Sequence, residues 1–373
     1  MKTQTITRLI LALSLWMFVL SDVQAKYEWI DDDALCDWAK TKKTRSYVFE
    51  LGNRGIACEG VADTNVGHLE QGHNDVFITT KNGLEGYYDI LNDTDADSMY
   101  LSGDLYLPVK CTATKKYPAV IIQHGSGSPN SDWYPRLAKA LTAKRIIALV
   151  PNSHSARGIQ GTSTDQTQLS KAGRLYDTFA AFRLLQDLPC VNPDRVGLTG
   201  YSFGGTISID SVESVMADKL GNGHIYKATL PVYPDCQSSF ETTRPTNTKV
   251  HMLLGGADDY TPASYCLDRI PRMQEAGWNV TTTVYEGAHH GFISSNPPRQ
   301  YNGWTFKDCG LGVITDEGYE ISERYGVNTK DGWAKAVETL VKECAKQGIT
   351  YGGSWELSNR TLKDTVDYFM SNL

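Results

Sequence analysis

The stretch DRVGLTGYSFGGTIS, residues 194–208, decides the fold expected for this chain. Its residues 195–199 form a short apolar run after Asn192-Pro193, as a buried strand would. The run enters the motif GYSFG, and a helix-compatible segment follows at 206–220. A serine between a strand and a helix, with glycine two residues away on each side, is typical of a nucleophile on a sharp, strained turn. A Cβ at either glycine would collide with the neighbouring strand or helix.

The alternative is a glycine-rich turn that happens to contain a serine. The flanking strand and helix favour the first interpretation, because they supply the structural context that the motif alone lacks. Ser202 is therefore the candidate nucleophile.

Predicted strands and helices alternate on both sides of this stretch. The expected strands lie at residues 76–80, 99–107, 119–123, 145–150, 195–199, 228–232, 250–254 and 280–285. The expected helices lie at residues 133–144, 169–188, 206–220, 263–276, 333–346 and 362–373. Repeated alternation predicts an α/β fold with a mostly parallel central sheet and helices on both faces. Since no repeat or linker divides residues 26–373, we expect one domain there, with residues 26–74 as an irregular N-terminal extension.

Residues 1–25 have the pattern of a secretory signal peptide. Lys2 and Arg8 give a basic start, residues 9–20 form an apolar core of about a dozen residues, and residues 23–25 suit the cleavage site. A membrane anchor is the alternative, but this run is shorter than a bilayer-spanning helix requires. We expect a secreted or periplasmic protein that is not stably inserted in a membrane after cleavage.

Charge and cysteine content narrow the class of protein. The chain has 36 Lys and Arg against 43 Asp and Glu, a net charge of −7, and a mildly acidic chain without basic runs argues against nucleic-acid binding. All 8 cysteines follow the signal, and an even number in an exported protein predicts disulfide bonds. No pair has the close C-x-x-C spacing of a zinc site, so disulfides are favoured over a metal.

Three cysteine pairings are expected. Cys236 and Cys266 each follow a late strand, so both should lie near the carboxyl edge of the sheet and close enough to pair. Order along the chain suggests, more weakly, the pair Cys309–Cys344. Cys36 and Cys58 would staple the extension.

A serine hydroxyl needs a base, a group that orients the base, and an oxyanion hole. In this architecture the acid and then the histidine follow the serine on loops after late strands. The strand at 250–254 runs into GGADDYTP, residues 255–262, and the strand at 280–285 runs into EGAHHGF, residues 286–292. Both loops leave the carboxyl ends of strands, where ligands bind in open α/β sheets. The motif GSG after an early strand, residues 125–127, offers a backbone N–H for the oxyanion.

These motifs resemble the dienelactone hydrolase family of the α/β-hydrolase superfamily, well over residues 75–295 and only loosely in the C-terminal helices. The resemblance rests on GYSFGG, on GGAD with Pro262 four residues later, and on YEGAHHGF; HG at 124–125 and NSHSARG at 152–158 give weaker support. It implies an α/β-hydrolase fold with Ser202 as nucleophile, Asp258 as acid and His290 as base.

One departure from the family changes the expected substrate. The family's namesakes use a cysteine nucleophile where this chain has serine. The serine favours a general carboxylic ester hydrolase over a dienelactone hydrolase, and export is at odds with intracellular aromatic catabolism. The expected partner is a small-molecule ester.

The expected roles follow from the chemistry of acyl transfer. His290 removes the proton of Ser202 during attack on the ester carbonyl, and Asp258 holds the imidazole tautomer. The N–H groups of Phe203 and, with less support, Ser126 stabilise the oxyanion. Water then releases the acid, and no cofactor or metal is needed.

The loop at residues 152–168 is too long for a simple connection and is expected to line a site. Its Arg157 is a candidate partner for a substrate carboxylate, with an ordinary surface arginine as the alternative. In the doublets Asp258-Asp259 and His289-His290, neighbouring side chains point in different directions, so one member of each can serve. The resemblance selects Asp258 and His290.

Two other functions remain open from the sequence. Related folds also cleave peptide bonds, so a peptidase or amidase is one alternative, although the chain lacks room for an N-terminal propeller domain. A non-catalytic binding protein that retains the fold is the other. The intact serine, acid and histidine argue against it.

Overall fold

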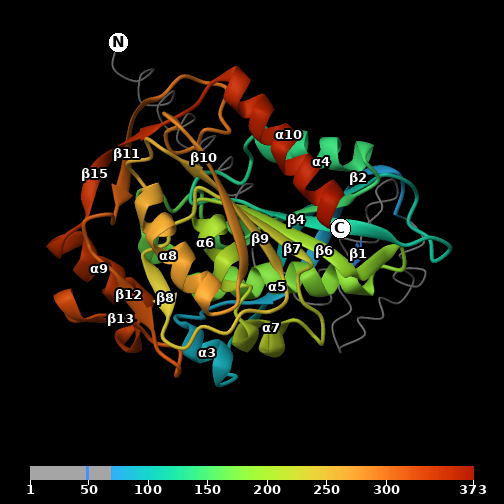
Figure 1. The fold of residues 1–373 in the computed structure, drawn as a ribbon. Helices are drawn as coiled ribbons and strands as arrows, with labels where there is room; N and C mark the ends of the chain where they lie inside the picture. The colour runs from blue at the N-terminus through green and yellow to red at the C-terminus, as the bar shows by residue number, and fades with distance from the viewer. Residues whose placement is uncertain (1–47, 50–68) are drawn as a thin grey trace, which may run out of the picture.

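The central sheet organises the molecule in the computed structural model, which describes residues 48–49 and 69–373 (Figure 1). Its strands are β1 (Val48–Phe49), β2 (Gly72–Lys81), β3 (Ser98–Leu107), β4 (Tyr117–Gln123), β5 (Ile147–Asn152), β6 (Val191–Tyr201), β7 (Ala228–Val232), β9 (Lys249–Gly255) and β10 (Asn279–Tyr285). They pair in the order β1-β2-β3-β5-β4-β6-β7-β9-β10. All neighbours from β5 to β10 run parallel, and β3 is antiparallel to β2 and β5. The mostly parallel sheet predicted from the sequence, that of an α/β-hydrolase fold, is confirmed.

Helices cover both faces of this sheet (Figure 1). The α-helices are α3 (Tyr87–Leu91), α4 (Trp133–Ala143), α5 (Lys171–Asp187), α6 (Phe203–Asp210), α7 (Ser214–Leu220), α8 (Ala263–Glu275), α9 (Trp333–Glu343) and α10 (Trp355–Asn372). Helices α4 and α10 pack on one face, and α5 and α6 pack on the other. This two-sided cover explains why the central strands are continuous apolar runs rather than alternating ones.

Strand β4 shows how one run supplies both cores. Val120 and Ile122 pack in the cluster under α4 and α10, whereas Ala119 and Ile121 pack in the cluster under α5. The alternation follows from the period of two along a strand. All four side chains are fully buried. The strand is therefore a fixed base for the loop that follows it, which carries Ser126.

Three helices differ from their predicted extents. The helix expected at 362–373 begins earlier, at Trp355. The helix expected at 206–220 is divided into α6 and α7, because the Glu213 carboxylate accepts hydrogen bonds from Thr243 Oγ1 at 2.6 Å and Arg244 N at 2.8 Å. These distant partners hold the backbone of Glu213 in an extended conformation at the start of α7. The helix expected at 333–346 ends at Glu343, and strand β15 (Lys346–Tyr351) follows it.

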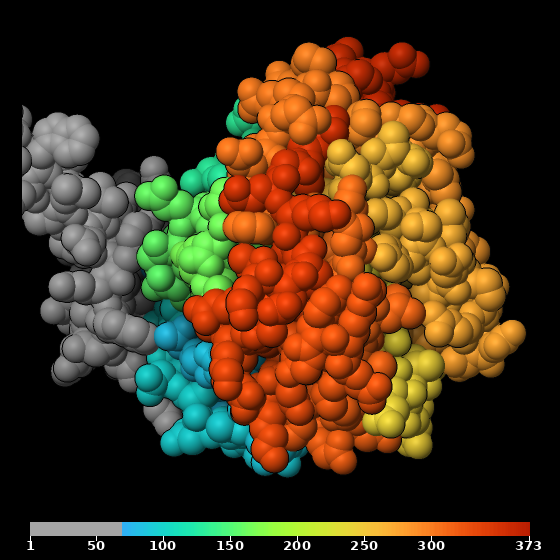
Figure 2. Space-filling model, turned by 90° about the vertical axis from the view of Figure 1, so that its left-hand side faces the viewer, coloured from blue at the N-terminus to red at the C-terminus, as the bar shows by residue number. Residues whose placement is uncertain are grey.

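Residues 299–351, here called the cap, contain strands that the sequence did not predict. Strand β11 (Arg299–Thr305) pairs with β15. The short strands β12 (Gly312–Ile314), β13 (Glu320–Ser322) and β14 (Val327–Asn328) form a second sheet with β8 (Ser238–Phe240), in the order β14-β13-β12-β8. Strands of two or three residues are too short to show a period. The cap, in orange to red, makes up much of the face shown in Figure 2.

Disulfide bonds join segments far apart in the sequence. The predicted pairs Cys236–Cys266 and Cys309–Cys344 are confirmed, with Cα–Cα distances of 5.0 and 5.1 Å. A third bond, Cys111–Cys190, ties the loop after β3 to the residue before β6. The predicted pair of Cys36 and Cys58 lies outside the described residues.

The N-terminal predictions are only partly covered by the described residues. The predicted signal, residues 1–25, lies outside them. Strand β2 begins at Gly72, so the end of the extension expected at 26–74 is in fact strand, paired with β3 along its whole length. Its start, Gly-His-Asn-Asp, has too few apolar side chains to show the strand period. Among the described helices, none combines the length and the apolar character that a membrane crossing requires.

Candidate active site

Ser202 lies on the turn between β6 and α6, and its backbone is strained. Its φ is 54° and its ψ −118°, a conformation that L-residues rarely adopt, and its N–H donates to Val232 O at 2.9 Å. A Cβ at Gly204 would lie 2.5 Å from Gln123 O, and one at Gly200 would overlap the backbone of Gly204. The turn therefore requires both glycines, as the motif predicts, and it presents the serine side chain at the carboxyl end of the sheet.

His290 connects Ser202 to an acid. Its Nε2 lies 2.9 Å from Ser202 Oγ, and its Nδ1 lies 2.8 Å from Asp258 Oδ2. His290 follows β10 and Asp258 follows β9, so adjacent parallel strands bring the two loops together. His290 is 2 % exposed and Asp258 is 6 % exposed. The three side chains form one continuous hydrogen-bonded chain from carboxylate to imidazole to hydroxyl.

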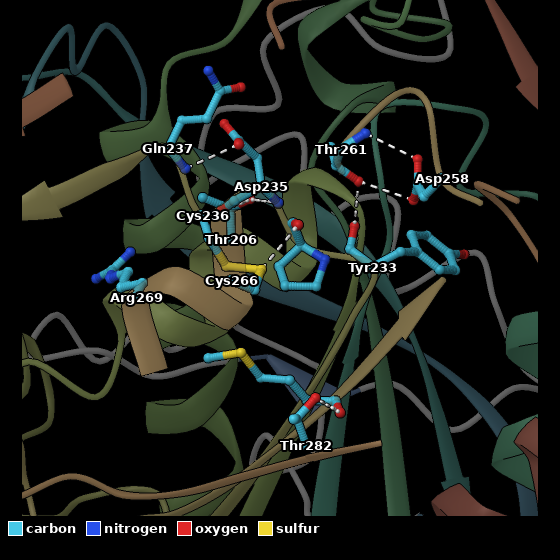
Figure 3. The surroundings of a disulfide bond; sticks show 12 residues. Thr206, Tyr233, Asp235, Cys236, Gln237, Asp258, Thr261, Cys266, Arg269 and Thr282 are labelled. Atoms are coloured by element: carbon cyan, nitrogen blue, oxygen red, sulfur yellow. Dashed lines mark hydrogen bonds between the residues drawn. A yellow bond between two sulfur atoms is a disulfide. The ribbon is translucent and has the colours of Figure 1, made fainter. Parts of the chain in front are cut away.

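The Asp258 carboxylate is oriented by its own loop. Its Oδ1 accepts the N–H groups of Tyr260 and Thr261, each at 2.9 Å. Thr261 Oγ1 lies 3.2 Å from Asp258 Oδ2 and donates to Tyr233 O at 3.1 Å (Figure 3). The same hydroxyl lies 3.1 Å from His290 Nδ1. Two backbone donors keep one oxygen in place while the other faces the imidazole. Thr261 was not identified from the sequence, because no motif marks its hydroxyl.

The His290 loop is held between aromatic rings. The rings of Tyr233 and Tyr260 lie 4.6 Å from the imidazole, measured between centroids. Gly291 has φ 72°, and a Cβ there would collide with the ring of Tyr351 in β15. The packing leaves the imidazole little freedom to turn away from Ser202.

The other members of the two doublets face elsewhere. Asp259 accepts hydrogen bonds from Thr350 N at 2.8 Å and Thr350 Oγ1 at 2.9 Å, so it binds the cap. His289 Nδ1 is buried and has no hydrogen-bond partner in the described part of the chain. Of the four residues in the doublets, only Asp258 and His290 belong to the hydrogen-bonded chain that reaches Ser202.

The backbone N–H groups of Phe203 and Ser126 have no acceptor among the described residues. Phe203 is the first residue of α6, where an N–H has no partner within its own helix. Ser126 follows β4, and both residues line the same pocket as Ser202. A Cβ at Gly125 would come within 3.2 Å of Ser202 Cβ, which shows how closely this loop approaches the serine. The arrangement can receive an oxyanion.

The prediction that Arg157 pairs with a substrate carboxylate is wrong. Its guanidinium forms a two-pronged ion pair with Asp177 at 2.8 and 3.0 Å and also donates to Ser153 O and Lys81 O. The Arg157 side chain is 5 % exposed, so it is not the surface residue of the alternative interpretation either. The Nε, Nη1 and Nη2 groups of Arg157 all donate hydrogen bonds within the protein. The residue thereby fixes the loop at 152–168 to α5 and β2. Of that loop, Gln166 lines the pocket.

The pocket in front of Ser202 has a volume of about 140 Å³ and is closed on one side by the cap. The apolar cap side chains that line it are Trp304, Phe306, Ile321, Val327, Trp333, Ala336, Val337 and Leu340. Its polar end contains Asp235, Lys171 and Glu320. Lys171 Nζ lies 2.7 Å from Glu320 Oε1 and so ties α5 to the cap, while burial raises the pKa of Asp235 against the opposing effect of Lys171. The helix that contributes Trp333, Val337 and Leu340 was predicted from the sequence, but its position at the pocket was not, and strands β13 and β14 are too short to show a period.

Parts of the chain are similar to known proteins. The profile of the dienelactone hydrolase family matches residues 104–310, a range that contains Ser202, Asp258 and His290. Protein usf of Aquifex pyrophilus is 22% identical over 211 residues, which are 52% of this chain and 87% of that protein. A putative carboxymethylenebutenolidase of Aquifex aeolicus is 21% identical with the same coverage.

Solved structures include similar chains. A dienelactone hydrolase-like promiscuous phosphotriesterase from metagenomic libraries aligns with a TM-score of 0.47 at 12% identity. The alignment covers 81% of this chain and 99% of that one.

Proposed function

This chain belongs to the dienelactone hydrolase family, and from that premise we propose that it is an exported serine hydrolase that cleaves carboxylic esters. One observation carries the proposal: the unbroken hydrogen-bonded chain from Asp258 through His290 to Ser202, which opens on a pocket. That it is a hydrolase follows from the family. We propose in addition that the substrate is a carboxylic ester, that the reaction passes through an acyl-enzyme, and that the residues have the roles given below.

In the proposed reaction, Ser202 Oγ attacks the ester carbonyl and its proton passes to His290 Nε2. Asp258 stabilises the imidazolium through Nδ1. The N–H groups of Phe203 and Ser126 hold the oxyanion until the intermediate expels the alcohol, which takes the proton from His290. Water then attacks the acyl-enzyme, giving its proton to His290 in turn. The carboxylic acid leaves, and the proton returns to Ser202.

The shape of the pocket supports an ester over a peptide substrate. A volume of about 140 Å³, closed on one side by the cap, suits a small acyl or alcohol group. An extended polypeptide would need an open groove on both sides of the serine. The contact of all three triad members also supports catalysis over a purely binding role, for which the orientation of the imidazole would be irrelevant.

Three disulfides in the described part of the chain support export, because such bonds persist in oxidising compartments. The signal-like residues 1–25 point the same way. Expression of the full chain, followed by N-terminal sequencing of the exported product, tests this part of the proposal. A product that begins at Lys26 supports it, whereas retention of the full chain inside the cell contradicts it.

Fluorophosphonate labelling and a panel of activated esters of increasing acyl length test the catalytic part. The wild-type protein should be labelled and should turn over the short esters, and Ser202→Ala should lose the label and at least ~10³-fold of the turnover. Ser211→Ala is the matched control, since its hydroxyl donates to Ser208 O further along the same segment. A Ser202→Ala variant with near wild-type turnover would overturn the proposal.

A further inference from the structure

Arg174 is a buried cation of α5 that lies against both loops of the oxyanion site. It is 1 % exposed, and its Nη2 donates to His124 O at 2.5 Å and Gly125 O at 3.0 Å. Its guanidinium carbon lies 5.3 Å from the centroid of the Phe203 ring. The residue touches neither Ser202 nor the other members of the triad, and the reaction proposed above gives it no role.

The charge of Arg174 is directed at carbonyl groups. Nη1 lies 2.7 Å from His154 Nε2, which must accept because the guanidinium can only donate. The carboxylate of Asp177, three residues further along α5, is ion-paired with Arg157 through both of its oxygens. Burial lowers the pKa of Arg174 to about 10, which leaves the guanidinium charged at neutral pH. A buried charge without its own counter-ion is costly unless its partners are strongly oriented dipoles.

The Gly125 carbonyl receives a second donor. His124 Nε2 accepts the N–H of Ser153 at 3.2 Å, so the ring proton of the neutral imidazole is on Nδ1, and Nδ1 donates to Gly125 O at 2.8 Å. Burial lowers the pKa of His124, which keeps this ring neutral. Two hydrogen bonds, one of them from a full positive charge, therefore converge on one carbonyl oxygen.

That carbonyl belongs to the same peptide unit as the Ser126 N–H. The unit is trans, so its oxygen and its N–H point in opposite directions. With the oxygen directed at Arg174 and His124, the N–H is directed away from them. A positive charge at the oxygen also withdraws electron density through the peptide, which makes the N–H a stronger donor.

We propose that Arg174 is the positioning residue of the oxyanion hole: it orients and polarises the Gly125–Ser126 peptide and packs against Phe203, the residue that supplies the other N–H. The inference rests on the proposed ester hydrolysis. Arg174 stabilises the transition state more than the bound ester, because charge on the substrate oxygen develops only as Ser202 attacks.

The test compares Arg174→Met, which keeps an unbranched stem of the side chain but removes the charge and the donors, with Arg174→Lys. Arg183→Met is the matched control, since Arg183 lies on the same helix, donates to one carbonyl, Leu220 O at 3.1 Å, and lies over the Tyr176 ring. For each variant we would measure kcat and KM on one activated ester. We would also measure inhibition by a trifluoromethyl ketone, whose adduct with the serine carries an oxyanion, and by the product alcohol, which carries none.

The expected signature is a split between transition-state and ground-state effects. Arg174→Met should lower kcat by ~10²-fold, which is the loss typical of one oxyanion-hole donor. It should lower the affinity for the trifluoromethyl ketone by the same factor. KM and inhibition by the alcohol should change less than about threefold, since ground-state binding is retained. The kcat and ketone affinity of Arg174→Lys should lie between those of Arg174→Met and wild type. Arg183→Met should have the wild-type values.

Three outcomes would overturn the inference. One is a folded Arg174→Met variant with wild-type kcat and ketone affinity. Another is an equal loss of affinity for ketone and alcohol, which indicates a collapsed pocket. If Arg174→Met does not fold, Arg174→Lys decides: it should lose kcat and ketone affinity together at constant KM, and wild-type values would reject the role. An inactive wild-type enzyme instead rejects the proposed function.

Discussion

The triad loops and the cap meet at one pocket but are held in different ways. The loops with Ser202, Asp258 and His290 leave three strands of the central sheet, and β9 and β10 pair over all seven residues of each. Their positions are consequences of a hydrogen-bonded ladder that runs through the core. A substitution at one position of this sheet therefore leaves many other contacts that keep the loops in place.

The cap is held by the short ladders β11–β15 and β12–β8 and by separate side-chain contacts. The disulfide Cys309–Cys344 closes it on itself, Lys171 pairs with its Glu320, and Asp259 binds its Thr350. Its ladders are less regular than that of β9 and β10: β11 and β15 pair with a register shift, and β12 pairs with β8 over three residues. The comparison teaches that the sheet positions the candidate catalytic residues. The shape of the pocket depends on individual contacts of the cap, each of which can be altered separately.

The largest effects should come from the triad doublets. We expect His290→Ala to lower turnover of an activated ester by at least ~10³-fold, and Asp258→Asn by ~10³- to 10⁴-fold through the wrong tautomer of the imidazole. His289→Ala and Asp259→Asn should retain turnover, and Asp259→Asn should loosen only the cap. Steady-state kinetics of the four purified variants on one ester measures this.

The opposite pattern would break the comparison. If Asp259→Asn were dead and Asp258→Asn active, the catalytic acid would be the residue that binds the cap. Chemistry and pocket shape would then share one residue, and the assignment of the acid would be off by one position.

Thr261 should have a smaller effect within the triad region. Thr261→Val removes the hydroxyl that lies between Asp258, His290 and Tyr233 O but leaves both backbone donors to the carboxylate. We expect kcat to fall by ~10-fold, equivalent to about 1.4 kcal/mol. Thr282→Val is the control, because its hydroxyl donates to Met252 O in the strand ladder, away from the triad (Figure 3). Equal kcat in the two variants would show that the backbone donors alone orient the acid.

The cap disulfide should affect binding rather than the chemical step. Replacing Cys309 and Cys344 by serine opens a loop with a sequence separation of 35, and the chain-entropy account assigns about 3–4 kcal/mol to such a closure. We expect KM to rise several-fold while kcat stays within about threefold of wild type. The double serine variant of Cys111 and Cys190, whose bond lies outside the pocket lining, should lower Tm without changing KM. A fall in kcat with unchanged KM in the cap variant would contradict this division.

The smallest effect concerns Asp235 at the polar end of the pocket. Burial raises the pKa of its carboxyl group, so the folded state binds this proton more tightly than the unfolded state does. The charged form is therefore destabilising above the ordinary carboxyl pKa, and the penalty disappears as the pH falls below it. Asp235→Asn should raise Tm by a few degrees at pH 8 and by nothing near pH 3. A lower Tm at pH 8 would show that the attraction of Lys171 outweighs burial.

Sequence reasoning worked where a motif or a period is local. The buried strands are runs of apolar residues, and the turn at Ser202 needs its glycines for steric reasons that involve only adjacent elements. The Cys236–Cys266 pair was predictable because both residues follow strands that end at the same edge. The order of serine, acid and histidine along the chain led to side chains that lie in contact.

Sequence reasoning failed where a residue far away in the sequence determines the local conformation or the partner of a side chain. Arg157 reads as a polar loop residue, and only the fold brings Asp177 beside it. The break between α6 and α7 depends on Glu213 binding the backbone of Arg244, which no helical period can show. Thr261 and Arg174 act through contacts made after folding, so neither has a motif.

The segments that flank the cap on its two sides lie against each other. The N–H of Gly352 donates to His290 O at 2.9 Å, and the N–H of Gly353 donates to Asn296 O at 2.7 Å. The chain therefore leaves the sheet after the histidine and returns to the same place before α10. An excursion whose entry and exit coincide is a cassette: its length and sequence can change, or be exchanged by design, while the histidine and the last helix keep their positions, as long as Tyr351 still packs against Gly291. New substrate ranges could arise in this protein by replacement of the cassette alone.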